Sequence, residues 1–172
     1  MSADDCALCA GTTMDGALMR AEVWSDELWR LTSSKASEVA GFSYLEPRRH
    51  IADITELDGE ESASFGPTIA AASKAIKDAT GAELVYVYVF GDGVPHLHVH
   101  LAPHRTVGSP LVSDMVKGAK HKVTLASGED VWVSDRYPLV DRDIMQAAID
   151  GIRQRLNPDQ EPPEQPDSPP SS

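Results

Sequence analysis

Residues 96–102 read His-Leu-His-Val-His-Leu-Ala, and this stretch decides the fold assignment. Histidine and apolar residues alternate with a period of two, which is typical of a β-strand with one face in the core. We therefore expect the imidazoles of His96, His98 and His100 on one face of a sheet and the apolar side chains on the other. The sequence predicts a face built from histidine.

The rest of the chain predicts an α+β domain around this strand. The other segments with strand character are residues 17–32 (two strands joined by a turn), 39–45, 84–90 (a buried strand) and 131–133 (a short strand). Asp58 and Glu61 have the spacing of a capping box, and the apolar residues that follow predict a helix from about residue 59 to 79, closed by Gly81. Residues 141–156 predict a second, amphipathic helix.

Three aromatic residues, Trp24, Trp29 and Phe65, lie at strand and helix positions, and we expect them in the core. His121 lies between two lysines, which indicates a position in solvent.

Composition limits the class of protein. The chain has 172 residues, enough for one domain, which we place at residues 1–156. Residues 157–172 hold six prolines and four acids and predict a disordered tail. The longest apolar run, at 84–90, is far shorter than a membrane span, and the acidic amino end is unlike a secretory signal.

The charge and the cysteine content exclude further classes. A formal charge of −12 argues against a nucleic-acid polymer as partner, although a small phosphorylated ligand needs only a few local donors. Two cysteines cannot form a disulfide framework, and with no secretory signal they indicate the reducing cytoplasm.

The histidine stretch supports two chemistries. A neutral imidazole can attack phosphorus while its neighbours fix its tautomer and stabilise developing charge. Alternatively, His96, His98 and His100 could surround one catalytic metal ion that activates water. Both readings describe an enzyme, and the residue types alone leave both open.

The match to a known family extends beyond this stretch. Residues 41–50 read Gly-Phe-Ser-Tyr-Leu-Glu-Pro-Arg-Arg-His, a strand and basic turn that end in histidine, and the expected long helix and buried strand separate them from residues 96–102. With its His-x-His-x-His and two apolar residues, the sequence resembles the histidine triad (HIT) family of nucleotide hydrolases and transferases over about residues 6–104.

This resemblance implies a fold and an activity. The HIT-like fold is a mainly antiparallel five-stranded sheet with a long helix packed on it, here with an added C-terminal helix, and the family forms homodimers whose sheets join edge to edge. By analogy His98 would attack the α-phosphorus of a nucleotide derivative, either a nucleoside phosphoramidate or a dinucleoside polyphosphate. His100 would contact the phosphoryl oxygens, and His96 completes the catalytic triad.

Cys6 and Cys9 form a Cys-x-x-Cys pair that alone could be a redox site, half of a metal site or an accident. The resemblance implies a zinc site made by Cys6, Cys9, His50 and His96. Such a Cys₂His₂ set is closed and tetrahedral, so this zinc would be structural and would not activate water.

The sequence departs from the family pattern near the substrate. The loop at 91–95 lacks the usual Gly-Gln pair, and no acidic residue for the ribose hydroxyls is evident around 31–35. We expect Arg105, His104 and Ser109 as substrate-binding residues, with a solvated loop and a surface histidine as the alternatives. The long connection from 105 to 120 favours a lid or substrate loop.

These departures keep three functions open. The first is a zinc-containing hydrolase or transferase that forms a nucleotidyl-histidine. The second is a metal-dependent hydrolase with the three histidines as ligands. The third is a nucleotide-binding module that keeps the scaffold but has lost turnover.

Overall fold

The computed structural model describes residues 5–90, 93–105, 120–134 and 138–159. The helices and strands, in chain order, are η2 (Gly11–Thr13), β1 (Arg20–Ser25), β2 (Trp29–Ser34), β3 (Ser43–Pro47), η3 (Ile54–Glu56), α1 (Gly59–Thr80), β4 (Leu84–Val89), β5 (Val99–His104), β6 (Lys120–Thr124), β7 (Asp130–Ser134) and α3 (Arg142–Leu156).

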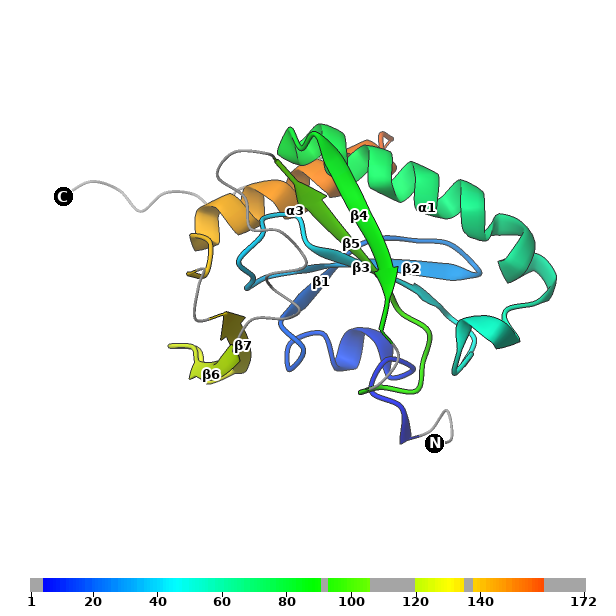
Figure 1. Cartoon of the computed structure of the whole chain (residues 1–172), viewed down its shortest axis with the longest axis horizontal. Helices are drawn as coiled ribbons and strands as arrows, with labels where there is room; N and C mark the ends of the chain where they lie inside the picture. Colours follow the sequence, from blue (N-terminus) through cyan, green and yellow to red (C-terminus); the bar gives the residue numbers. More distant parts are fainter. Residues whose placement is uncertain (1–4, 91–92, 106–119, 135–137, 160–172) are drawn as a thin grey trace.

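A five-stranded sheet forms the centre of the molecule. Its strand order is β1-β2-β3-β5-β4, and every neighbouring pair is antiparallel. Helices α1 and α3 lie side by side on one face of this sheet (Figure 1). A separate β6–β7 hairpin lies apart from the sheet. The expected α+β architecture, with a long helix and a C-terminal helix on the sheet, is confirmed.

The core lies between the sheet and the two helices. It contains these buried residues of the strands and helices: Val23, Trp29, Leu31, Leu45, Ala72, Ile76, Val99, Leu101, Ile149 and Ile152. Trp24 and Phe65 pack against this cluster, so the three aromatic residues expected in the core belong to it. Burial of such side chains is the main stabilising contribution to a domain of this size.

Helix α1 follows the prediction closely at its C-terminal end and differs at its start. Gly81 takes φ +65°, a left-handed conformation that favours glycine, and its N–H donates to the Lys77 carbonyl. At the other end the Asp58 side chain makes no cap hydrogen bond. It pairs instead with Arg49, which also binds Glu61, so an ion pair replaces the expected capping box.

Two strands differ from expectation. The third strand starts at Ser43 and not at residue 39, and Val39 and Phe42 before it pack in a second small cluster with Ala102. The segment expected as a buried strand forms β4, which is an edge strand. Val87 and Phe90 are 46% and 48% exposed, so the prediction of burial was wrong for the single chain.

The polar hairpin strand β6 has no apolar alternation and was not predicted, whereas its partner β7 contains the expected segment 131–133. His121 on β6 is exposed, as expected. The predicted loop or lid lies mostly in residues 106–119, and most of the predicted tail in 160–172, outside the described residues. None of the helices in the described part of the chain is long and apolar enough to span a membrane.

Candidate active site and metal centre

The face of the sheet opposite α1 and α3 carries the candidate site, and we call it the histidine face. On β5 and just before it, Leu97, Val99 and Leu101 are buried in the core, so His98 and His100 point the other way. The expected alternation is therefore present, although regular pairing of β5 begins only at Val99.

Hydrogen bonds define the tautomer of His98. Its Nδ1–H donates to the carbonyl oxygen of His96 at 2.7 Å, because a carbonyl can only accept. Burial lowers the pKa of His98 below its usual value, with a smaller contribution from the positive charge of Arg20. In the neutral ring Nε2 then carries the free lone pair, which is the atom a nucleophilic imidazole uses.

His100 lies among aromatic rings. The ring of Tyr88 on β4 stacks parallel to it, with centroids 4.7 Å apart and planes 4° apart. Tyr44 on β3 meets it at an angle, at 5.3 Å, and Phe42 and Phe90 lie within 6.0 Å. The centroids of the His98 and His100 rings are 5.1 Å apart. These contacts hold the third histidine beside the second in a defined orientation.

His96 belongs to a different cluster. Its Nε2–H donates to the carbonyl oxygen of Pro47 at 2.9 Å, which leaves the lone pair on Nδ1. That atom lies 3.5 Å from the Cys6 sulfur and 3.3 Å from the Cys9 sulfur, and His50 Nδ1 lies 3.2 Å from the Cys9 sulfur. Burial lowers the pKa of His96, which favours the neutral ring that a metal ligand requires.

This cluster fits a tetrahedral metal ion. One ligand atom from each of Cys6, Cys9, His50 and His96 lies within 4.8 Å of the other three. Zinc bonded to sulfur and nitrogen at about 2.0–2.3 Å would place such atoms about 3.3–3.8 Å apart. The Pro47 carbonyl orients His96 as an outer partner of a zinc ligand commonly does. The four residues predicted as metal ligands are thus together, contributed by the N-terminal segment, the turn after β3 and the bend before β5.

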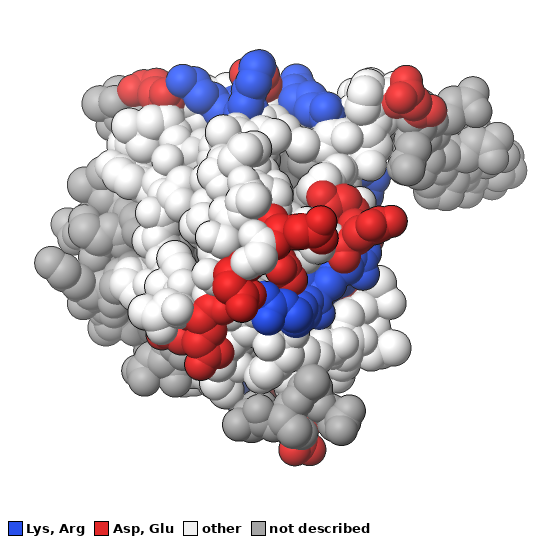
Figure 2. Space-filling view, turned by 90° about the vertical axis from the view of Figure 1, so that its right-hand side faces the viewer, with Lys and Arg blue, Asp and Glu red and all other residues white. Residues whose placement is uncertain are grey.

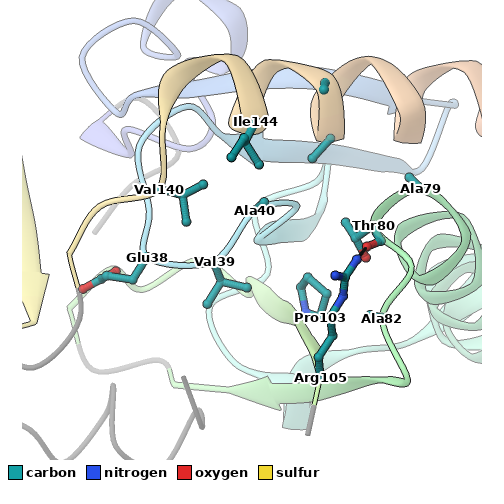
Figure 3. Close-up of a pocket in the computed structure, with 12 residues that line it drawn as sticks. Glu38, Val39, Ala40, Ala79, Thr80, Ala82, Pro103, Arg105, Val140 and Ile144 are labelled. Carbon is teal, nitrogen blue, oxygen red and sulfur yellow. Dashed lines mark hydrogen bonds between the residues drawn. The ribbon is translucent and has the colours of Figure 1, made fainter. Parts of the chain in front are cut away.

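The predicted substrate-binding residues are less well placed. The Arg105 guanidinium donates to the Thr80 carbonyl oxygen at the end of α1, beside a cavity of about 460 Å³ on the helix side (Figure 3). The alternation that points His98 and His100 to one face places Arg105 on the other, so the structure does not support it as a phosphate ligand. His104 is on the histidine face but lies against Tyr86, further along β5, and Ser109 is outside the described residues.

A buried ionic network on the same face was not predicted. Arg20 on β1 pairs with Glu46 on β3, and Arg30 on β2 lies 3.8 Å from Glu46 and pairs with Glu22 and Asp15. Burial raises the pKa of the Glu46 carboxyl, and the two guanidinium groups oppose this rise. The available signal was a charged residue, Arg30 or Glu46, next to a core residue of the same strand, Leu31 or Leu45.

Comparison with known proteins decides the family. The family model of the HIT domain matches residues 20–107, from β1 to just beyond β5. The chain belongs to the HIT domain family. A comparison with curated proteins found no match.

Solved structures of HIT proteins share this fold. A hypothetical histidine triad nucleotide-binding protein of Sulfolobus tokodaii is 20% identical with a TM-score of 0.62, over 89% of this chain and 93% of that one. A zinc-bound histidine triad family protein of Mycobacterium smegmatis is 16% identical with a TM-score of 0.59, over 91% and 96%. A histidine triad protein of Bradyrhizobium japonicum is 22% identical with a TM-score of 0.61, over 81% and 92%.

Parts of the chain lie outside the residues that the HIT model matches. Cys6 and Cys9 precede the matched residues, and β6, β7 and α3 follow them. The two histidines of the metal cluster, by contrast, lie inside the HIT domain, at residues 50 and 96. The candidate metal centre therefore joins the N-terminal segment to the strands that carry the triad.

Proposed function

We propose that this HIT domain protein is a nucleotide hydrolase or transferase that acts at the α-phosphate of a nucleoside phosphoramidate or dinucleoside polyphosphate. The observation that carries the proposal is the tautomer of His98, whose Nδ1–H is held by the His96 carbonyl and whose Nε2 is free to attack. The HIT family match supports a nucleotide as the substrate, as does the nucleotide-binding description of the Sulfolobus tokodaii protein.

In the first step Nε2 of His98 forms a bond to the α-phosphorus, and the leaving group departs with the electrons of the broken bond. In the second step water or another acceptor attacks the same phosphorus and releases His98. His100, beside it, contacts the phosphoryl oxygens, and the His96 backbone holds the nucleophile in the productive tautomer. The triad thus divides one displacement into two.

In this proposal, a zinc ion held by Cys6, Cys9, His50 and His96 has a structural role. With four protein ligands the ion has no open position for water. The same geometry argues against the metal-dependent hydrolase, because Nδ1 of His96 faces the cysteines and Nε2 faces Pro47. Since these cysteines must stay reduced to bind metal, we assign the protein to the cytoplasm.

The proposed partners are a small nucleotide and a second copy of the chain. On the face shown in Figure 2, acidic side chains form a band with basic ones beside it, and the whole chain carries a charge of −12, which disfavours polyanions. The exposed apolar edge at β4, with Val87 46% exposed, supports a homodimer whose sheets join edge to edge.

Release of nucleoside monophosphate from a panel of adenosine and guanosine phosphoramidates and dinucleoside polyphosphates tests the function. We expect turnover by the wild type, loss of at least about a thousandfold in His98→Ala, and no change in His121→Ala, whose exposed histidine is the matched control. If the wild type and His98→Ala both bind nucleotide but neither turns it over, the protein is a nucleotide-binding module and not an enzyme.

A further inference from the structure

Four side chains form a ladder across the histidine face. The guanidinium carbon of Arg20, on β1, lies 3.8 Å from the centre of the Tyr44 ring on β3. Tyr44 lies opposite His100 in the β3–β5 register, and its ring is 5.3 Å from the imidazole. Tyr88, opposite His100 in the β4–β5 register, stacks on it from the other neighbouring strand. We infer that Arg20 is a positioning residue that acts through Tyr44 to set the orientation of His100.

The ionic network keeps Arg20 in place. Its Nη1 donates to the carboxylate of Glu46, which is 2% exposed, and the side chain of Arg20 is 12% exposed. Arg30 approaches the other carboxylate oxygen at 3.8 Å and is itself held by Glu22 and by Asp15. Glu46 is therefore fixed by a cation on each side, and Arg20 is anchored above the Tyr44 ring.

The charges of the network indicate positioning and not direct phosphate binding. Asp15, Glu22 and Glu46 carry three negative charges against two positive ones, so the charge of Arg20 is balanced before any ligand arrives. Besides its small effect on the pKa of His98, Arg20 offers the contact of a planar guanidinium with a ring face, an interaction that orients the ring.

The orientation matters because two tyrosines confine His100. With Tyr88 parallel to it and Tyr44 at an interplanar angle of 63°, the imidazole cannot rotate without displacing a ring. In the proposed function, on which this inference rests, His100 contacts the phosphoryl group, and small errors in such placement lower the rate strongly.

The test uses zinc-loaded protein and the Arg20→Gln, Arg20→Lys and Arg48→Gln variants. Arg48 is exposed and bonds to the Asp26 carbonyl, so its variant is the matched control for the loss of one charge. We expect Arg20→Gln to lower kcat about 3- to 30-fold with KM changed less than about twofold. Arg20→Lys should recover part of the rate, because it keeps a cation beside Glu46 and Tyr44.

Nitrogen NMR of the His100 imidazole separates this inference from the proposed function. If Arg20 positions His100, its ring signals shift in Arg20→Gln and stay at wild-type positions in Arg48→Gln, whether or not any substrate is turned over. Unchanged His100 signals in a folded Arg20→Gln protein would overturn the inference, even with a reduced rate. If the enzyme is active and Arg20→Gln turns over substrate at the same rate as Arg48→Gln, the inference is overturned as well.

Discussion

At the residue scale, the proposed function depends on how the chain holds two imidazoles. His98 is held by the backbone carbonyl of His96, and His100 is held by rings. Alternation along the strand predicts that these histidines share a face, because it is a local property. It does not predict the tautomer, which depends on a carbonyl placed by the bend before β5, or the Tyr88 stack, which depends on strand register.

The stack on His100 gives a prediction for Tyr88. Burial raises the pKa of its phenol above the usual value, so the hydroxyl stays neutral and the ring acts by its face. We expect Tyr88→Ala to lower kcat about 2- to 12-fold, in line with the energy of an aromatic pair, and Tyr88→Phe to keep the wild-type rate. Single-turnover kinetics on the nucleoside phosphoramidate measures both. Equal losses in both variants would show that the hydroxyl, and not the stack, is what matters.

At the element scale, the candidate metal centre joins the N-terminal segment to β3 and β5. Cys6 and Cys9 lie before the first strand, yet their sulfurs reach His50 and His96. The sequence alone does not predict this meeting, since the ligands are separated by 41 and 87 residues in the closest pairs. The resemblance to the family supplied the set, and the geometry is compatible with it.

Cys9→Ser tests this centre. We expect the variant to lose most of its bound zinc and to unfold about 5–10 °C lower, because losing a structural zinc removes a sizeable part of the folding free energy. Zinc analysis by mass spectrometry and a thermal scan, with His121→Ala as the control, measure both. If Cys9→Ser keeps its full zinc content and its Tm is unchanged, these four residues do not form a metal centre.

Local sequence signals predicted most elements. Apolar residues at helical spacing and Gly81 defined α1, and period-two alternation defined the strand that carries the histidines. Signals between distant residues were missed. Glu46 and Arg20 are 26 residues apart in the sequence, and the residues of either strand alone do not predict that the two side chains pair. If the alternation of β5 is continued by one residue, Arg105 falls on the face opposite the histidines.

At the scale of the whole molecule, β4 forms one edge of the five-stranded sheet and, among the residues that the structure describes, has a neighbouring strand on one side alone. Its apolar side chains led to the prediction of a buried strand, but in one chain it is an edge. A second copy paired there would bury residues such as Val87, and would explain why an edge strand carries an apolar sequence. Composition predicts one domain, but it contains no information on which edge remains exposed.

Val87→Asp tests the dimer. We expect the wild type to sediment as a dimer and Val87→Asp as a monomer, because a carboxylate cannot be buried in the joined edge without a partner. Ile144→Asp is the matched control, since Ile144 is 57% exposed and lies on α3 and not on β4. Analytical ultracentrifugation over a range of concentrations distinguishes the cases. A dimer that persists in Val87→Asp would exclude the β4 edge as the interface.

In the proposed mechanism His98 becomes covalently bound to the nucleotide, and mass spectrometry of the intact protein detects this bond. After rapid mixing with an adenosine phosphoramidate and an acid-free quench, we expect a mass increase of one adenylyl group, mapped by peptide analysis to His98 and absent in His98→Ala. Turnover of the same substrate with no adduct, or with an adduct on another residue, would contradict it.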